Sequence, residues 1–194
     1  MAEATGVERG NGDADGETNV YERNRKDILN KGRKIRIQGA FLMGSGRKLI
    51  RKEDITELMG GREGFLRIFT RFYERLHDDP LMRVLFNESK EERTPQHHGE
   101  ILGSFILASS IGDKTYFSLK GSHGIRLAHQ RAKSCPLRDE KHQGRGFTDN
   151  QSLSWLAHLS EACDDLGVPE EFRDRLTLFL GAAISRYGPF ISDD

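Results

Sequence analysis

The chain has 194 residues, a formal net charge of zero and only two cysteines, Cys135 and Cys163. This length fits one domain with an extension, and a balanced charge gives no overall field that would attract nucleic acid. Two distant cysteines exclude a disulfide framework, and the apolar runs are too short to cross a membrane. The acidic, glycine-rich start is unlike a secretory signal. We therefore expect a cytoplasmic protein with no membrane span and no nucleic-acid partner, whose oligomeric state is left open.

The first fifty residues are divided by charge. Residues 1–22 hold six acidic side chains and one basic one, whereas eleven lysines or arginines and one acid, Asp27, follow between Arg23 and Lys52. Because so polar a segment cannot bury enough apolar surface, residues 1–50 are predicted to be a disordered, acidic-then-basic extension. A basic arm also suits contact with phosphate or anionic lipid. The sequence does not separate that role from an unbound, solvated tail.

The folded domain is predicted to span residues 51–194 and to begin with two helices. Asp54 can cap a short helix that reaches Met59, and a pair of glycines ends it. Apolar residues then recur at helical offsets near three, four and seven until Pro80, which ends the second helix and can start a short turn through Phe86. The apolar residues of this second helix are Phe65, Leu66, Ile68, Phe69, Phe72, Tyr73 and Leu76.

Three further helical segments follow. Pro95 suits the first turn of a helix that runs to about Ser110 and is closed by Gly112. Helical periodicity returns from about Asn150, and a last helix follows Pro169. No alternating strand pattern occurs, so we predict an all-α domain with four substantial helices. The inward stripe of the helix that starts at Pro95 consists of His98, Ile101, Leu102, Phe105 and Ile106.

The segment 113–148 is polar and rich in glycine, and its only helical candidate lies around residues 125–132. A long structureless loop inside a compact domain indicates that something else organises it. Haem would do so, since it needs an apolar slot between helices and one neutral nitrogen ligand for its iron. His129, beside Leu127, is a candidate for that ligand. His98 would then face the other side of the ring.

The residues alone leave two other interpretations open. A histidine on an apolar helix face is often a hydrogen-bonded core residue rather than a ligand. Four histidines also raise the question of zinc. That signal is weak, because no two of them lie four apart on a helix and no cysteine pairs with one at a zinc-site spacing. The four are His97, His98, His123 and His129.

Several short motifs stand in a characteristic order. Gly60-Gly61 precedes the second helix, which carries the aromatic pair Phe72-Tyr73. Phe86 follows Tyr73 by thirteen residues, and Trp155-Leu156 comes late in the chain. In the middle, Thr115-Tyr116 and Lys120-Gly121 lead to His129, thirteen residues after the tyrosine. With these motifs, residues from about 55 to 190 resemble the truncated haemoglobins, short globins with a two-over-two helical sandwich.

The resemblance implies a fold, a cofactor and a set of site residues. The fold is the globin-like two-over-two sandwich, and the cofactor is haem b, an iron protoporphyrin IX. His129 is the implied proximal iron ligand, and His98 is the distal residue and a candidate sixth ligand. Trp155 matches the distal tryptophan of the second and third groups, which makes the chain group II-like. The residues implied around haem are Phe72, Phe86, Leu102, Phe105, Tyr116, Arg126, Leu127 and Trp155.

The chain departs from the family pattern in spacing. Gly112 stands alone where the family has a pair of glycines, and the connection before the distal helix is longer than usual. This insertion bears on the choice between His97 and His98 as the distal residue. We choose His98, because Leu102 and Phe105 follow it at offsets of four and seven on one helix face.

The resemblance also implies a function. Oxygen, nitric oxide and carbon monoxide are the expected ligands, and Tyr73, His98 and Trp155 are hydrogen-bond donors that would stabilise a bound gas. Oxygen transport, nitric oxide dioxygenation with an unidentified reductase and peroxidase-like activity are all compatible with such a site. Two other functions stay open. One is a bis-histidyl haem protein for electron transfer or redox and gas sensing, and the other is a haem-free globin-fold interaction scaffold.

Overall fold

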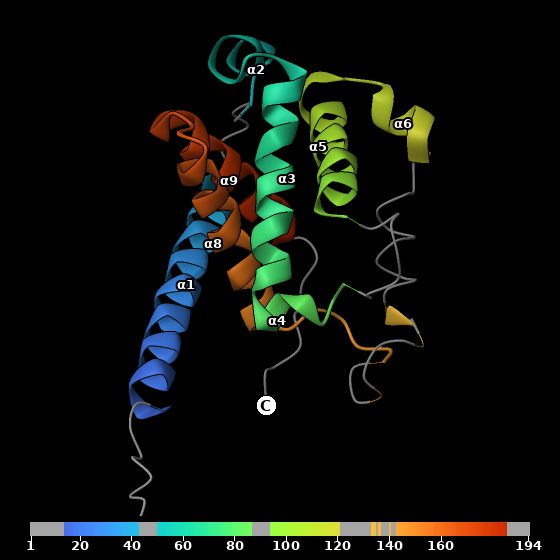
Figure 1. Cartoon of the computed structure of the whole chain (residues 1–194). Helices are drawn as coiled ribbons and strands as arrows, with labels where there is room; N and C mark the ends of the chain where they lie inside the picture. Colours follow the sequence, from blue (N-terminus) through green and yellow to red (C-terminus); the bar gives the residue numbers. More distant parts are fainter. Residues whose placement is uncertain are drawn as a thin grey trace, which may run out of the picture.

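The structure is a computed structural model that describes residues 14–42, 50–86, 94–120 and 143–185, with residues 133, 134, 136 and 140. The described chain is helical and contains no β-strand (Figure 1). The predicted all-α class is therefore confirmed. The helices are α1 (Ala14–Leu42), α2 (Lys52–Met59), α3 (Arg62–Asp78), α4 (Pro80–Arg83), α5 (Pro95–Ile111), α6 (Thr115–Lys120), α8 (Asp149–Asp165) and α9 (Glu170–Ile184).

Four long helices form two antiparallel pairs, α3 with α5 and α8 with α9 (Figure 1). Helix α3 also packs on α8, so that the two pairs share one core. The centre of this core is a stripe on α3 in which Phe65, Phe69, Phe72 and Leu76 are completely buried. Their spacing of four, three and four residues places them on one helix face. Each such burial stabilises the fold by about 1.5–3 kcal/mol.

Local geometry confirms the predicted ends at Gly60 and Gly112 and the predicted start at Pro95. Asp54 does not cap α2 as expected: it lies in the first turn, and its carboxylate accepts a hydrogen bond from the backbone N–H of the cap residue Arg51 at 3.1 Å. Gly60 and Gly112 follow α2 and α5 with φ angles of 66° and 77°, the left-handed conformation that favours glycine. At the start of α5, the Thr94 hydroxyl oxygen accepts a hydrogen bond from the backbone N–H of His97 at 3.2 Å. Pro95 occupies the first turn, where a missing backbone N–H costs nothing.

Two glycines fix how α5 lies on α3. A Cβ atom added to Gly99 would lie 2.5 Å from the backbone nitrogen of Thr70, and one added to Gly103 would lie 2.5 Å from a methyl group of Leu66. The two helices therefore approach more closely than side chains at these positions would allow. This close contact sets the register in which His98, next to Gly99, faces the C-terminal half of α3.

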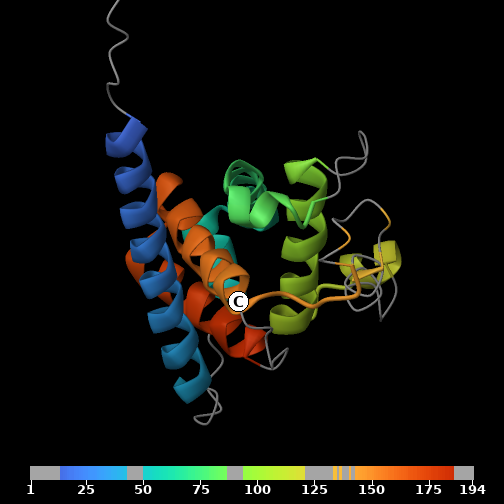
Figure 2. The ribbon, with the colours of Figure 1, turned by 90° about the horizontal axis from the view of Figure 1, so that it is seen from below.

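The N-terminal segment differs from the prediction. We expected residues 1–50 to be disordered, and this was wrong for residues 14–42, which form helix α1. The helix packs across α8 and α9. Seen from below, it forms an outer layer on the side of the molecule opposite α5 (Figure 2). Residues 1–13 and 43–49 lie outside the described part of the chain.

The contacts of α1 with α8 and α9 explain why the sequence did not predict this helix. A Cβ atom on Gly32 would lie 1.9 Å from the carbonyl oxygen of Leu153 in α8, and one on Gly39 would lie 2.7 Å from the backbone nitrogen of Ala182 in α9. Ile35, between the two glycines, is buried. Glycine weakens an isolated helix, but here it lets backbones approach, so the stabilising contacts come from segments distant in the sequence.

The remaining polar face of α1 is strongly basic. Arg36 forms an ion pair with Asp149 at 2.6 Å, and Lys31 forms one with Asp164 at 3.5 Å, so α8 holds the helix by charge as well. Such partly exposed pairs contribute at most about 1 kcal/mol each. No described helix, α1 included, combines the length and the low polarity needed to cross a bilayer.

Candidate functional site

Four aromatic side chains meet where α3 ends and α5 begins, and we call them the distal cluster: Tyr73, His77, Phe86 and His98. Tyr73 and His77 lie four residues apart and therefore share a face of α3. His98 comes from the first turn of α5 and stacks on Tyr73, with ring centroids 5.1 Å apart and 29° between the planes. Segments that are distant in the sequence thus build one cluster.

Phe86, which follows α4, closes the cluster. Its ring stacks on His77 at a centroid distance of 4.5 Å with 19° between the planes. It also lies 5.8 Å from the Tyr73 ring, edge to face, and 5.6 Å from the ring of His98. All four side chains are only partly buried. The cluster therefore presents aromatic surface that the described chain does not cover.

A buried phenylalanine links the distal cluster to α8. The ring of Phe72 is completely buried and meets Tyr73 edge to face at 5.2 Å. On its other side it meets Trp155 at 4.8 Å, with 83° between the planes. Edge-to-face contacts of this kind orient both rings. Phe72 thus holds Tyr73 on α3 and Trp155 on α8 in a fixed relation.

The apolar surface continues along α5 beyond His98. Leu102 and Phe105 are partly buried and pack against the core, one and two turns further along the helix. Tyr116 of α6 is almost completely buried and meets Phe105 edge to face at 5.2 Å. Helix α6 therefore secures the end of an apolar wall that begins at the distal cluster.

Two titratable groups of the distal cluster, Tyr73 and His77, are held neutral. Burial raises the pKa of the Tyr73 hydroxyl well above its ordinary value of 10.0, so this group stays protonated and can donate a hydrogen bond. Burial also lowers the pKa of His77 below 6.5, an effect that Arg83 assists and Asp78 opposes. At neutral pH the cluster thus offers a hydroxyl and a neutral imidazole rather than fixed charges.

The structure brings many of the predicted residues together. Three of them form the distal cluster with His77, two are joined to it by ring contacts, and three lie along α5 and α6. In that order they are Tyr73, Phe86 and His98; Phe72 and Trp155; and Leu102, Phe105 and Tyr116. The other three, Arg126, Leu127 and His129, lie outside the described residues. The proximal half of the site therefore stays a prediction.

His77 was missed by sequence reasoning. The helical pattern of α3 was followed only through its apolar residues, the last of which is Leu76. The available signal was the offset of four from Tyr73, which places His77 on the same face. A histidine at such an offset is ordinary on an exposed helix end. Its partial burial against Phe86 depends on the path of the chain after α4, which the helical pattern does not contain.

A second histidine lies in an ionic network that joins the end of α3 to α8: Arg75, Asp79, His158, Glu161 and Asp165. The Nε2 atom of His158 lies 2.9 Å from a carboxylate oxygen of Asp79, and its Nδ1 atom lies 3.3 Å from Glu161. Arg75 pairs with Glu161 and, at 2.8 Å, with Asp165. Every member therefore has an oppositely charged neighbour when His158 is protonated.

The pKa values in the ionic network follow from this pairing. Burial alone would lower the pKa of His158, but hydrogen bonds to Asp79 and Glu161 outweigh burial and raise it. Burial would likewise raise the pKa of Glu161, but His158 and Arg75 lower it to about 2. The network is thus a set of ion pairs that stabilises the contact between helices.

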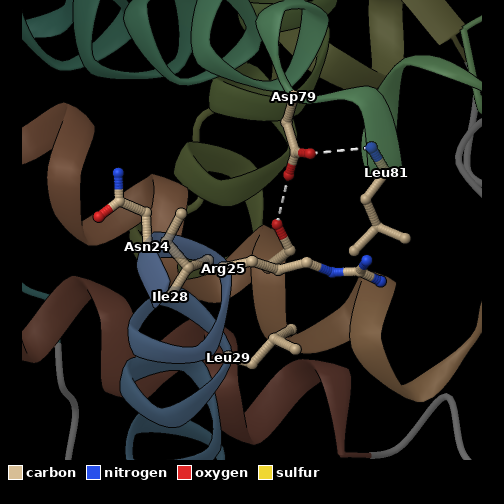
Figure 3. Close-up of a pocket in the computed structure, with 7 residues that line it drawn as sticks. Asn24, Arg25, Ile28, Leu29, Asp79 and Leu81 are labelled. Carbon is tan, nitrogen blue, oxygen red and sulfur yellow. Dashed lines mark hydrogen bonds between the residues drawn. The ribbon is translucent and has the colours of Figure 1, made fainter. Parts of the chain in front are cut away.

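A small cavity adjoins this network, on the α1 side of α8 (Figure 3). The Asp79 carboxylate at its edge accepts hydrogen bonds from the Ser154 hydroxyl at 2.7 Å and from the backbone N–H of Leu81 at 2.8 Å. A volume of about 60 Å³ has room for a few water molecules and not for a cofactor. The lining residues are Asn24, Arg25, Ile28, Leu29, Asp79, Leu81 and Ser154.

The described residues contain no metal site built from protein ligands alone. Across the part of the chain that the structure describes, no three histidine, cysteine, aspartate or glutamate side chains are grouped so that they could hold a metal ion. His97 and His98 belong to that part, whereas His123 and His129 lie outside it. The neutral, aromatic character of the distal cluster suits an apolar cofactor better than a bare cation.

A comparison with known protein families found a match. A family model described as bacterial-like globin matches residues 54–182, which is more than half of the chain. The matched range begins in α2 and ends in α9, so it includes the distal cluster, Trp155 and His129. No curated protein and no solved structure matches the chain.

Proposed function

The chain belongs to the bacterial-like globin family, whose members bind haem, and we propose that it holds haem b and reversibly binds oxygen, nitric oxide or carbon monoxide. The observation that carries this proposal is the distal cluster. In it a neutral hydroxyl and two imidazoles lie among aromatic rings from three segments of the fold. Trp155, held by Phe72, supports a group II-like distal site.

The described residues fit haem in shape and polarity. Haem is a flat apolar group, and most of the side chains in question are large, apolar or aromatic, and only partly buried. Tyr73, Phe86, Leu102, Phe105 and Trp155 each leave surface that such a group would cover. The Nε2 atom of His77 is buried and has no hydrogen-bond partner in the described structure, so a polar partner is missing there as well.

The proximal ligand in this proposal is His129. A neutral imidazole is the usual protein ligand of globin iron, and the motif spacing that resembles the truncated haemoglobins assigns this role to His129. Leu127 would contact the ring beside it, and Arg126 would pair with a haem propionate. Tyr116, buried at the end of the α5 wall, would secure the segment that leads to this ligand.

The distal residues would control how firmly a gas is held. Haem, when bound, supplies an iron that takes a diatomic gas and shifts partial negative charge onto it. The Tyr73 hydroxyl, the His98 imidazole and the Trp155 indole N–H can each donate a hydrogen bond towards such charge. One bond of this kind is worth about 1.5–3 kcal/mol. Several together would slow gas release, which suits chemistry or sensing better than bulk oxygen transport.

An absorption spectrum of the full chain purified with added haem tests this function. We expect a Soret band in the ferric and ferrous states and a shift of the ferrous band under carbon monoxide. His129→Ala should release most of the haem, whereas the matched control His123→Ala should retain it. A chain without a Soret band would overturn the proposal, and equal retention by both variants would overturn the assignment of His129.

The same spectra separate gas binding from electron transfer. If the deoxy ferrous protein is five-coordinate, its distal position is open to a gas, as we propose. Low-spin six-coordinate bands that disappear in His98→Leu would instead show His98 on the iron and assign the protein to electron transfer or redox sensing. The consumption of nitric oxide by the oxygen-loaded protein, in the presence of an added reductant, would measure dioxygenase activity directly.

A further inference from the structure

His77 has a hydrogen-bonding need that the described chain does not meet. Its Nε2 atom is buried and makes no hydrogen bond there. A neutral imidazole carries one donor and one acceptor nitrogen, and buried polar atoms in native proteins nearly always have partners. The natural partner of this atom is therefore a group outside the described residues, such as a bound water molecule.

The surroundings of His77 show that packing does not require its nitrogen. The ring stacks on Phe86 at 4.5 Å, a contact that a phenylalanine could make equally well. The backbone carbonyl oxygen of His77 accepts a hydrogen bond from the side chain of Arg83 at 2.9 Å, which any residue at this position could do. The polar atom is thus an addition to a position where an apolar ring would suffice.

His98 is the nearest polar side chain that ring contacts connect to His77. The two ring centroids lie 6.2 Å apart with 36° between the planes. Even with nitrogens pointed at one another, rings at this separation leave a gap too long for a direct hydrogen bond. One water molecule that accepts from one ring and donates to the other fills such a gap.

We propose that His77 is a positioning residue of the distal pocket, and that its Nε2 atom binds a single water molecule which bridges to the imidazole of His98. The inference rests on the proposed gas-binding function, because its effect is exerted on the distal histidine. The bridge lies on the side of His98 next to Phe86. The assignment adds His77 to the residues that shape the site without contact to the gas itself.

The water bridge would determine the tautomer of His98 and the orientation of its ring towards a bound gas. In a neutral imidazole, the partner of one nitrogen determines which nitrogen carries the proton and how the ring is oriented. A water molecule fixed by His77 would hold one His98 nitrogen, so that the other points into the pocket in a single protonation form. Loss of the water held by His77 would remove this constraint on His98 and weaken the hydrogen bond that His98 donates to the gas.

The test uses the haem-loaded full chain and the variants His77→Phe, His98→Leu and the double variant. We expect His77→Phe to move the carbon monoxide stretching band to higher wavenumber and to raise the oxygen dissociation rate by about 2- to 10-fold, the equivalent of one hydrogen bond. Because His77 acts through His98, the double variant should match His98→Leu alone. An effect of His77→Phe that persists without His98 would overturn the proposal.

Two further variants distinguish positioning from simple packing. His77→Gln restores a side-chain amide that can hold water, and it should bring the stretching band back towards the wild-type position. His97→Phe is the matched control, since its ring lies at a similar distance of 6.4 Å from His98 but outside the cluster, and it should leave the band unchanged. Failure of glutamine to rescue, or an equal shift in the control, would overturn the role of His77.

The outcomes of these experiments also distinguish the role of His77 from the proposed gas-binding function on which it rests. A wild-type protein without a Soret band would overturn the gas-binding function and the role of His77 together. A normal Soret band and a normal carbon monoxide adduct, with a stretching band that His77→Phe does not move, would overturn only the role of His77.

Discussion

Two histidines near the end of α3 differ in every respect that matters for a buried imidazole. His158 lies between the carboxylates of Asp79 and Glu161, and these partners raise its pKa although burial opposes them. His77 stacks on Phe86, has a buried nitrogen without a partner in the described structure, and has a lowered pKa because of burial. One histidine has carboxylate partners that favour its protonated form, whereas burial favours the neutral form of the other, whose buried nitrogen has no partner among the described residues.

The two environments differ in whether the described chain supplies partners for the ring nitrogens: it does so for His158, and it does not for the Nε2 atom of His77. In the ionic network both ring nitrogens of His158 lie beside carboxylates, and these ion pairs hold α8 to the end of α3. The distal cluster around His77 is incomplete, because its rings are partly uncovered and a polar atom is unmatched. We propose that haem binds on this side of the fold, where it would cover the partly exposed rings.

The largest expected effect is the loss of the paired histidine. His158→Leu should lower the free energy of unfolding by about 3 kcal/mol near pH 6, since it leaves the carboxylates of Asp79 and Glu161 without their shared partner. Urea denaturation followed by circular dichroism measures this loss. His77→Leu is the matched control and should show no comparable loss. Equal destabilisation by the two variants would break the contrast between these histidines.

The next largest expected effect is a loss of stability at Gly32 of α1, the helix that forms the outer layer. Gly32→Ala should destabilise the chain by about 2 kcal/mol, because the added methyl group meets the Leu153 carbonyl oxygen and forces α1 away from α8. Asn30→Ala, at an exposed position of the same helix, should be nearly neutral. Haem affinity should stay unchanged in both variants, since the distal cluster lies elsewhere. Loss of haem in Gly32→Ala would mean that the two regions are coupled.

A smaller effect of opposite sign is expected at the unpaired histidine. In the haem-free chain, His77→Phe should raise the free energy of unfolding by about 1 kcal/mol, because an apolar ring of similar shape keeps the contact with Phe86 and no longer has to immobilise a water molecule. Thermal unfolding of the purified full chain measures the change. Destabilisation would show instead that the nitrogen already has a partner in the native chain, and the contrast with His158 would lose its basis.

The smallest effect is a difference in pH dependence. Because the pKa of His158 is raised in the folded state, its contribution is complete below the ordinary value of 6.5 and is lost as the pH rises through the raised value. The lowered pKa of His77 works in the opposite direction, and its contribution is lost as the pH falls below 6.5. Melting temperatures across this range should therefore decline on the alkaline side in the wild type and decline less in His158→Gln. An unchanged alkaline slope in that variant would contradict the ion-pair assignment.

Much of the fold could be predicted because it depends on local rules. Pro95 lacks a backbone N–H and therefore suits the first turn of a helix rather than its interior. Gly60 and Gly112 adopt the left-handed conformation that ends a helix. Tyr73 and His98 were placed by helical periodicity, which assigns a residue to the core-facing stripe. The sequence therefore predicted α3, α5, α8 and α9, and it placed Tyr73 and His98 on the helix faces that the structure brings together.

The rest depended on contacts between distant segments. Helix α1 is polar and contains two glycines, and only the close approach of α8 and α9 explains why it is ordered. The pairing of Asp79 with His158 joins residues 79 positions apart, which no local pattern indicates. The unmatched nitrogen of His77 is likewise a property of its neighbours. Such features become visible only when the helices are assembled.

The single tryptophan of the chain offers the most direct test of the central claim, that haem binds beside the distal cluster. The ring centroid of Trp155 lies 4.8 Å from that of Phe72, and Phe72 contacts Tyr73 of the distal cluster. Haem bound beside the distal cluster would therefore accept the excitation energy of Trp155. Titration of the full chain with haem should quench tryptophan fluorescence in step with the growth of a Soret band and end at one haem per chain. Full fluorescence at saturating haem would contradict a haem site beside Trp155.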